Sequence, residues 1–399
     1  MDKHPSRHRG RQPAGMRLAA IALALAASGT AQALDYSGYM RAGPGLTSGD
    51  TARACYGLSS GSAGLKYRLG NECDFYGEFQ FVQGFKKDGL DYSATLMVNH
   101  YTPGTDTSGT GPGIEQMFAE AKGFDIAPNA TFWIGKARGR RGDVHIVDTY
   151  FIDMAGVGAG FRGQPLGAGN FGVAFYKTDG GTTQPGNRLN VEYMGLPVGA
   201  DGALNFFLTA TKGDFTGGKS GLGLTARHDQ GKLFGTSLSN TLFVQYAQGS
   251  ASLNANFGNL TAGSQAKSWR VVESVNGQSG ALGGQAIVLM ASEKNAAGSK
   301  TDSATVGGRA SYALTKNFKL VGEAGYSQFK PQSGSTAKLT KVTIAPTLSV
   351  GPDFWSRPEF RLYVTSAKWN TAAGNVTGQT AFANKTSGTS YGAQAEWWF

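Results

Sequence analysis

The feature that most constrains this chain is a regular alternation of apolar and polar residues, repeated in short runs up to the last residue. Examples are the runs 204–211, 341–348 and 359–365. Successive side chains of a β-strand point to opposite faces, so this pattern predicts strands in contact with water on one face only. Glycine-rich polar stretches separate the runs at 102–113, 179–187, 213–218, 249–263, 295–301 and 371–388. Almost no stretch has apolar residues at helical spacing, and no break in composition suggests a second domain.

The C-terminal run distinguishes between two all-β architectures. One face of 391–399 carries Tyr391, Ala393, Ala395, Trp397 and Phe399, and the other carries Gly392, Gln394, Glu396 and Trp398. In a soluble sandwich this strand would be an exposed apolar edge strand, which is prone to aggregation. In an outer-membrane barrel its aromatic side chains lie at the lipid interface, and the strand pairs with the first one. We therefore predict a closed antiparallel transmembrane β-barrel in the bacterial outer membrane.

The N-terminus reads as a signal peptide spanning residues 1–33. Lys3, Arg7, Arg9, Arg11 and Arg17 precede the apolar run 18–27, and Ala31-Gln32-Ala33 is a cleavage motif. Ten apolar residues are too few to cross a bilayer, which needs about 20. We expect the barrel to occupy 34–399, with Met16 as a possible initiator. Removal of residues 1–33 leaves 32 basic and 26 acidic residues, so the formal charge falls from +10 to +6.

The mature part of this chain, which the signal peptide directs to export, contains two cysteines, Cys55 and Cys73. An oxidising compartment would join them across a loop rich in glycine and serine. Two free thiols are the alternative. A metal site is less favoured, because the mature chain has only three scattered histidines (His100, His145 and His228), and we expect no cofactor.

Segment 133–160 combines a short apolar run with many charges. Eight charged or imidazole side chains fall within residues 136–153, although only 16% of the chain is charged. Aromatic and aliphatic residues stand between the acids, and Gly156, Gly158 and Gly160 follow. A loop folded into a water-filled cavity can place its apolar residues against the wall and its charges toward water. We predict such a loop here.

Alternation also assigns aromatic residues to the inner face of the barrel. If Trp397 and Phe399 face lipid, Trp398 faces the lumen beside Glu396. In the first mature strand the same argument turns Tyr39 and Arg41 inward, and Trp355 shares the parity of Arg357, Glu359 and Arg361. Rings stack on the apolar faces of sugars, whose hydroxyls bind charged groups. A lumenal ring can also simply fill space against an inward loop.

Five ordered blocks of the chain resemble the maltoporin family of carbohydrate-selective outer-membrane porins. They are LDYSGYMRAGPG, KYRLGNEC followed by DFYGEF, GRRGDVHIVDTYFIDMAGVGAG, FWSRPEFRLYVTSAKW and GAQAEWWF. The resemblance covers most of the mature chain. It implies a homotrimer of barrels in outer-membrane lipid, each with about 18 strands and a third loop that narrows the pore.

The resemblance also implies a path of aromatic rings for an oligosaccharide substrate, flanked by charged residues. The matching aromatic positions are Tyr39, Tyr76, Trp355 and Trp398, with Tyr150 opposite them at the narrowest point. The matching polar positions are Arg41, Arg68, Glu78, Arg141, Asp143 and Asp148. Asp143 and Asp148 could equally serve to position the loop.

Some positions depart from the family. Ala119 stands where the family carries an arginine, and Leu238 and Ser239 stand where its aromatic path continues. Tyr101 is a candidate for the ring at the pore entrance, which a neighbouring subunit supplies in the family. These departures leave open a looser channel for short or different oligosaccharides.

Three other functions were considered. A general or anion-selective porin would use the basic excess to attract anions. A secreted glycosidase would need a carboxylate pair, for which Glu396 or Asp148 could be nominated. A receptor role of the outer loops would be an addition to transport. The prediction is a sugar porin, not an enzyme, with no nucleic-acid partner.

Overall fold

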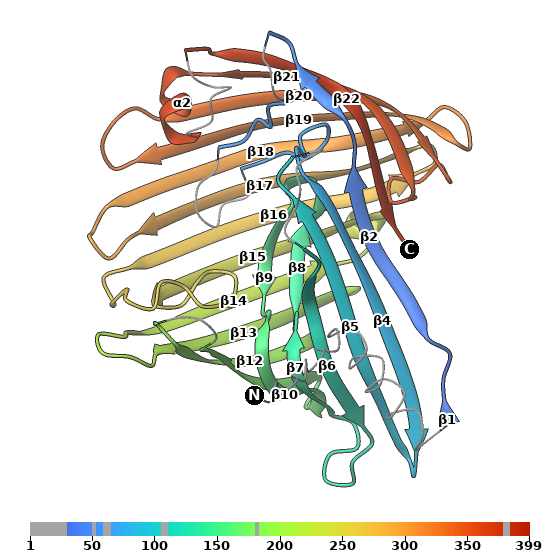
Figure 1. The fold of residues 1–399 in the computed structure, drawn as a ribbon, viewed down its shortest axis with the longest axis vertical. Coiled ribbons are helices and arrows are strands. Elements are labelled where there is room, and N and C mark those ends of the chain that lie inside the picture. Colours follow the sequence, from blue (N-terminus) through green and yellow to red (C-terminus); the bar gives the residue numbers. More distant parts are fainter. Residues whose placement is uncertain (1–29, 50–52, 59–64, 105–110, 180–182, 378–383) are drawn as a thin grey trace, which may run out of the picture.

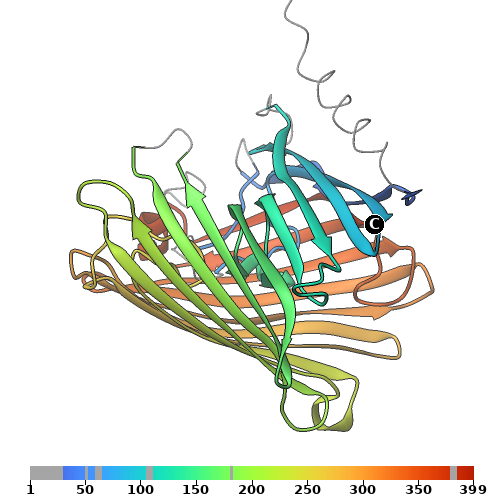
Figure 2. The same cartoon turned by 90° about the horizontal axis from the view of Figure 1, so that it is seen from below.

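The computed structural model describes residues 30–49, 53–58, 65–104, 111–179, 183–377 and 384–399. The predicted signal segment therefore lies outside the described residues, apart from its last four. One 20-stranded antiparallel sheet closes on itself, and two of its strands, β1 (Thr30–Ala31) and β3 (Gly45–Thr47), only prolong neighbouring ladders. The remaining 18 strands form the barrel (Figures 1 and 2). The predicted all-β barrel is thus confirmed.

The barrel strands follow one another around the wall in sequence order. They are β2 (Asp35–Ala42), β4 (Phe75–Lys87), β5 (Leu90–Thr102), β6 (Gly113–Lys122), β7 (Thr131–Ala137), β10 (Gly156–Leu166), β11 (Gly169–Thr178), β12 (Gly186–Pro197), β13 (Gly202–Gly213), β14 (Ser220–Gln230), β15 (Leu238–Gly249), β16 (Lys267–Ser279), β17 (Leu282–Lys294), β18 (Lys300–Ala313), β19 (Phe318–Pro331), β20 (Ala337–Ser349), β21 (Glu359–Trp369) and β22 (Ser387–Trp398). The last strand closes the barrel on the first, with Tyr39 opposite Trp398 and Arg41 opposite Glu396.

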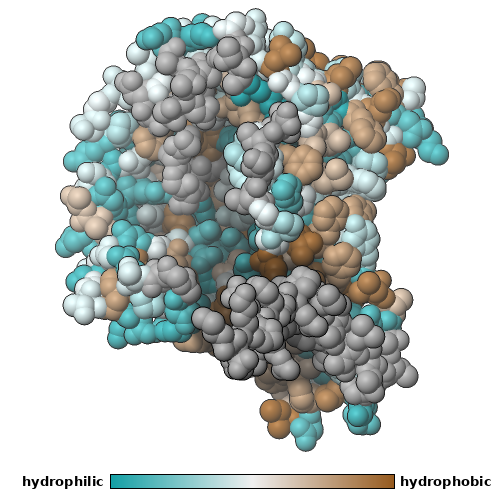
Figure 3. Space-filling view, viewed as in Figure 1, coloured by the Kyte–Doolittle hydropathy of each residue, from teal (hydrophilic) through white to brown (hydrophobic). Residues whose placement is uncertain are grey.

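The two faces of the wall follow the predicted alternation. On β20 and β21, Val342, Ile344, Phe360 and Leu362 are exposed, while the residues between them are buried inside the barrel. At the end of the chain, Trp397 contacts Phe399 with ring centroids 5.0 Å apart, and Phe399 contacts Tyr36 at the same distance. Figure 3 shows apolar residues gathered over the outer side of β2 and β4. This surface suits lipid or another barrel.

The two rims of the barrel differ in the length of their connections. The first barrel strand, β2, begins and the last, β22, ends at the rim where strands are joined by short turns, such as 88–89, 167–168 and 280–281. Long connections, among them 138–155, 250–266 and 370–386, lie at the other rim. Outer-membrane barrels have short turns on the periplasmic side and long loops outside. We call these the turn-side rim and the loop-side rim.

Helical structure is slight in the described residues. It consists of α2 (Thr371–Thr377) and the 3-10 turns η1 (His145–Val147) and η2 (Leu233–Gly235). No helix among these residues is long and apolar enough to cross a membrane.

Candidate functional site: the narrowed lumen

The connection between β7 and β10, residues 138–155, folds into the barrel. This inner loop contains β8 (Arg141–Val144), η1 and β9 (Thr149–Asp153), and β8 pairs with β9 in a sheet of its own. Its apolar residues Val144, Ile146, Phe151 and Ile152 are at most 1% exposed. Figure 1 shows β8 and β9 between the two sides of the wall. The predicted loop in the cavity is present, with apolar residues turned to one side.

Buried side chains of the wall hold the inner loop in place. Gln245 donates to the Phe151 carbonyl at 2.7 Å, and the Arg270 guanidinium lies 4.6 Å from the Phe151 ring centroid. Arg188 donates to the carbonyls of Met154 and Ala155 at 3.0 and 2.9 Å. Residues 250–266 support the loop from behind, since the Asp153 amide donates to the Asn254 carbonyl at 2.8 Å. The loop is therefore fixed against β12–β16.

A second segment, which we call the disulfide loop (residues 53–58 and 65–74), covers another part of the wall. Cys55 and Cys73 form the expected disulfide, with Cα atoms 5.9 Å apart. The ring of Tyr67 lies so close to β18 and β19 that a Cβ at Gly325 would be 2.0 Å from it. Lys341 donates to the Leu69 carbonyl at 2.7 Å. These contacts attach the disulfide loop to β18–β21.

The inner loop, residues 250–266 and the disulfide loop leave the open part of the lumen along β2 and β4–β6, with Trp398 at the end of β22 beside it. Inner side chains of β12–β21, such as Arg188, Arg270, Lys341 and Thr365, are buried. Inner side chains of β4–β6, such as Glu78, remain partly exposed. A solute passing through the barrel would therefore travel along β2 and β4–β6, past Trp398.

Aromatic and charged residues alternate along each strand of this part of the wall. Register places Trp398, Tyr39 and Glu78 side by side on β22, β2 and β4, and Glu396, Arg41 and Tyr76 in the next inward row. Neighbours across strands share a face, so all six point into the lumen. The rings of Tyr39 and Tyr76 lie 6.2 Å apart. Each ring in this surface therefore has a charged neighbour two residues along its own strand.

Trp355 and Trp398 form a second aromatic group near the turn-side rim. Their ring centroids are 6.4 Å apart, and His145 of the inner loop contacts both rings edge-on at 5.4 and 5.5 Å. The Arg357 guanidinium lies 4.1 Å from the Trp398 ring centroid. Trp355 is in the turn 350–358, before β21 begins, so strand parity does not place it. It reaches the lumen because this turn brings it against His145.

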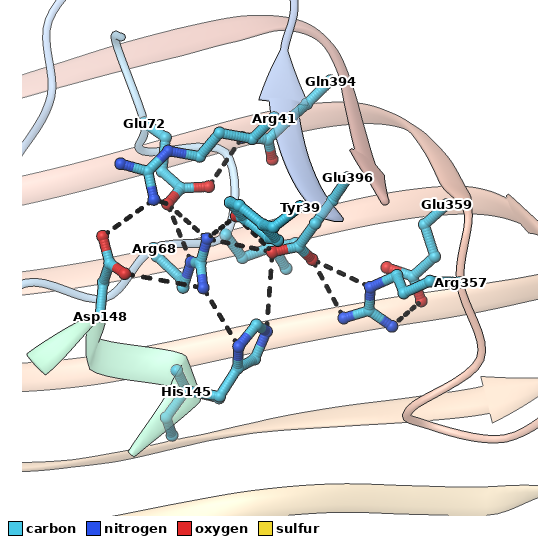
Figure 4. A network of polar contacts seen from close by, with 12 residues as sticks. Tyr39, Arg41, Arg68, Glu72, His145, Asp148, Arg357, Glu359, Gln394 and Glu396 are labelled. Atoms are coloured by element: carbon cyan, nitrogen blue, oxygen red, sulfur yellow. Dashed lines mark hydrogen bonds and ion pairs between the residues drawn. The ribbon is translucent and has the colours of Figure 1, made fainter. Parts of the chain in front are cut away.

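A dense ionic network joins the disulfide loop, the inner loop and β22 (Figure 4). Arg68 lies at its centre, with Glu72 at 2.8 Å, Glu396 at 3.0 Å, His145 at 3.1 Å and a short hydrogen bond to the Tyr39 hydroxyl. The Arg68 side chain is only 5% exposed. It therefore binds three segments of the chain that are far apart in sequence.

Arg41 extends the network toward the lumen. Its guanidinium contacts Glu72 at 2.9 Å, Asp74 at 2.6 Å and Asp148 at 3.1 Å. Arg357 and Arg361 hold the other side of Glu396, the former at 3.0 Å. The carboxylates thus share their guanidinium partners, and the network keeps both donors and acceptors beside the rings.

The pKa values of two inner-loop residues follow from this network. Burial alone would raise the pKa of Asp148, but Arg68, Arg41 and Lys66 outweigh it and hold the pKa well below its ordinary value. Burial, with added repulsion from Arg68, holds the pKa of His145 well below its ordinary value. At neutral pH the carboxylate is therefore charged and the imidazole neutral.

The inner loop presents a ring and charges to the opposite side of the open lumen. The Arg141 guanidinium lies over the Tyr150 ring, 4.0 Å from its centroid, and Asp143 pairs with Tyr150 across the small sheet. Asp143 and Tyr150 are both exposed. Glu78 belongs to a separate group with Tyr76 (2.6 Å) and Arg138 (2.9 Å). The predicted site residues therefore fall into three groups around one passage.

Several residues of this site were not predicted from the sequence. Glu72 and Asp74 flank Cys73, and their proximity to a cysteine that anchors an inward loop is the only signal that could have indicated them. Arg138 pairs with Glu78 and Glu115 at the start of the inner loop. Arg357 and Glu396 were not among the predicted binding residues, yet they pair with each other at 3.0 Å within the network.

The family departures have structural explanations. Ala119 is exposed and pairs with Ala94 and Ile134, which places it on the outer face, so an arginine there would not line the passage. Leu238 begins β15 on the outer side, far from the open lumen. Tyr101 pairs with Tyr76 and lies on the inner face at the loop-side rim of its own barrel. No group of His, Cys, Asp and Glu in the described residues could hold a metal ion.

Comparisons with known proteins give a family match and several similar solved structures. The model of the LamB porin family matches residues 34–399. Similar solved structures include OccD3 (OpdP) of Pseudomonas aeruginosa, at 8% identity and TM-score 0.49, covering 94% of this chain and 92% of that one. An anion-selective porin from Comamonas acidovorans is 11% identical with TM-score 0.47, covering 92% and 99%. OccAB2 of Acinetobacter baumannii is 10% identical with TM-score 0.48, covering 92% and 98%.

Proposed function

The chain belongs to the LamB porin family, the maltoporin family, and from this premise we propose that its barrel conducts neutral oligosaccharides by facilitated diffusion. Family and fold make it a porin of the bacterial outer membrane, a channel rather than an enzyme. The observation that supports a sugar substrate is the surface on β22, β2 and β4. There, Trp398, Tyr39 and Tyr76 alternate along the strands with Glu396, Arg41 and Glu78, and of these charged residues Arg41 and Glu78 are partly exposed to the lumen.

This surface offers both kinds of contact that a sugar needs. The apolar C–H face of a pyranose ring packs on an aromatic ring, while its hydroxyls exchange hydrogen bonds with the neighbouring charged groups. A hydroxyl that loses water without finding a partner costs about 1–3 kcal/mol. Passage then requires binding that is favourable enough for sugar to enter and weak enough for it to leave.

The charge balance favours an uncharged solute over an anion. The network around Arg68 contains six cations and five carboxylates. They are Arg41, Lys66, Arg68, Lys319, Arg357 and Arg361, with Glu72, Asp74, Asp148, Glu359 and Glu396. Each cation of this network is paired with a carboxylate, so the network has little net charge to attract anions. Its partly exposed members Arg41, Asp74 and Asp148 still offer hydrogen-bond donors and acceptors to hydroxyls.

One tryptophan on the lumen side and one on the outer side, with nearly equal exposure, allow a matched test. Trp355 is 39% exposed in the lumen, and Trp397 is 41% exposed on the outer face. Planar-bilayer recordings with a panel of sugars should show concentration-dependent block of the ion current by one class of oligosaccharide. Trp355→Ala should raise the half-blocking concentration about 5–30-fold, the equivalent of about 1–2 kcal/mol of ring stacking. Trp397→Ala should leave it unchanged.

Two results would contradict the sugar assignment. Indifference of the current to every sugar, with preferential anion conductance, would favour the alternative, a general or anion-selective porin. An equal effect of both tryptophan variants would show that lumenal stacking is not responsible for the block.

We also propose that three copies assemble as a homotrimer, as the resemblance implies. The aromatic cluster of Tyr36, Phe81 and Phe399 on the outer face near β2 offers an apolar contact surface for a neighbouring barrel. Unheated protein should migrate in mild detergent at three times the mass of the chain. Migration at the mass of one chain would refute the trimer.

A further inference from the structure

Six lysines lie along the loop-side rim on consecutive strands of the wall. They are Lys267, Lys294, Lys300, Lys330, Lys338 and Lys368, on β16 to β21, and all six are exposed. Register places Lys267 opposite Lys294 and Lys294 opposite Lys300, so three of them stand side by side. We call these six residues the lysine belt.

The lysine belt points away from the lumen. Lys267 shares its face with exposed Trp269, two residues along the strand, and Lys300 shares its face with exposed Val306. By the same alternation, Lys338 shares the face of Val342 and Lys368 that of Val364. The belt therefore adjoins the apolar surface that meets lipid, and it has no part in the ionic network of the lumen. Figure 3 shows hydrophilic residues along the left edge, where these strands meet the loops.

The lysine belt keeps to one height in the membrane. Lys330 pairs with Asp302, Lys338 with Gln328 and Lys368 with Thr340, so the belt shifts by two residues at each of these pairings. Six residues over five strand-to-strand steps, at about 3.3 Å per residue and about 4.8 Å between strands, correspond to an inclination of about 40°. Strands of outer-membrane barrels tilt by about 35–45°. The shift therefore compensates for the tilt and keeps the lysines level.

The charge of this surface is strongly positive. On β16–β21 the acids that share the outward face are Asp302, 3.1 Å from Lys300, and Glu273, which lies six residues from Lys267 and accepts a hydrogen bond from Asn240. Asp302 also lies opposite Lys330, so the other four lysines of the belt have no carboxylate of these strands beside them on their face. Lysines next to an apolar surface extend their stems along it and place their ammonium groups at the level of lipid headgroups.

We propose that the lysine belt binds phosphorylated glycolipid headgroups of the outer leaflet, the lipopolysaccharide of a bacterial outer membrane. The loop-side rim faces the cell exterior in such barrels, so the belt lies in this leaflet. Phosphates on neighbouring headgroups match a row of ammonium groups spaced by the strands of the sheet, and each lysine near an anionic headgroup adds to the affinity. The proposal depends on the outer-membrane location and not on the identity of the solute.

Native mass spectrometry of the purified protein in detergent tests the proposal. The probes are bis-phosphorylated lipid A and the same lipid A with both phosphates removed. The protein should retain the phosphorylated lipid and release the other. The triple variant Lys267→Gln, Lys294→Gln, Lys300→Gln should bind the phosphorylated lipid about 100-fold more weakly, at about fivefold per lysine.

A control triple removes the same charge from the other rim. Lys87, Lys122 and Lys316 are exposed at the turn-side rim, and their replacement by Gln should leave lipid binding unchanged. Equal retention of both lipids, or equal weakening by both triples, would overturn the proposal. Failure of the assembled protein to retain any lipid would also overturn it, because the belt would then be covered by another subunit. If the belt triple does not fold, the single variant Lys294→Gln should still weaken binding about fivefold, and an unchanged affinity would count against the belt.

Discussion

Replacement of Arg68 by Met should destabilise the barrel far more than its position in a loop suggests. Removing one partner of a buried ion pair costs about 3–5 kcal/mol when the other partner is left alone. Here Glu72 keeps Arg41 at 2.9 Å, and Glu396 keeps Arg357 at 3.0 Å. We therefore expect a loss of about 2–3 kcal/mol in the free energy of unfolding.

Lys66→Met provides the matched control. Lys66 lies 3.8 Å from Asp148, but its side chain is 35% exposed, so its loss should cost less than about 0.5 kcal/mol. Urea unfolding in phospholipid vesicles, followed by tryptophan fluorescence, measures both values. Single-channel conductance of Arg68→Met should also rise, because the side chain links the disulfide loop to His145. The reasoning fails if the two variants unfold within about 0.5 kcal/mol of each other.

Two further predictions concern the disulfide loop and the inner loop. Gly325→Ala should displace the disulfide loop and raise conductance, because its Cβ would lie 2.0 Å from the Tyr67 ring; Gly322→Ala on the same strand meets nothing within 4 Å and should leave conductance unchanged. The pKa of His145 is lowered in the folded state, so on going from pH 7 to 5 the unfolded chain takes up a proton that the folded chain does not, and stability should fall. His145→Gln should remove this component of the pH dependence in urea titrations, and an unchanged slope would exclude His145 as its source.

The alternation of residues determined the wall of this barrel before any contact was known. Tyr39, Arg41 and Trp398 face the lumen, as parity predicts, because the two faces of a strand follow from local backbone geometry alone. The same argument placed Trp397 and Phe399 on the outside. The inner loop was also recognisable, since charges mixed with aromatic residues between two strands suit neither lipid nor a dry core.

The alternation of side chains does not assign a face to residues outside strands, or to residues beyond a point where strand pairing is irregular. Trp355 lies in a turn, and its position depends on His145 of a loop more than 200 residues away in sequence. Between β5 and β6 the register shifts at Met97 and Val98 of β5, so that Glu115 of β6 stands unpaired between Gln116 and Ile114. The faces along β6 therefore could not be assigned from one end of the strand to the other without the pairing.

The sequence by itself determined the architecture, the faces of the strands and the existence of an inward loop, because each depends on neighbours within about ten residues. Only the tertiary structure decided which charges meet. Arg68, His145 and Glu396 contact one another because the last strand closes on the first and two loops fold into the space between. Partners separated by up to about 330 residues are chosen by closure of the barrel, and no local pattern in the sequence records that choice.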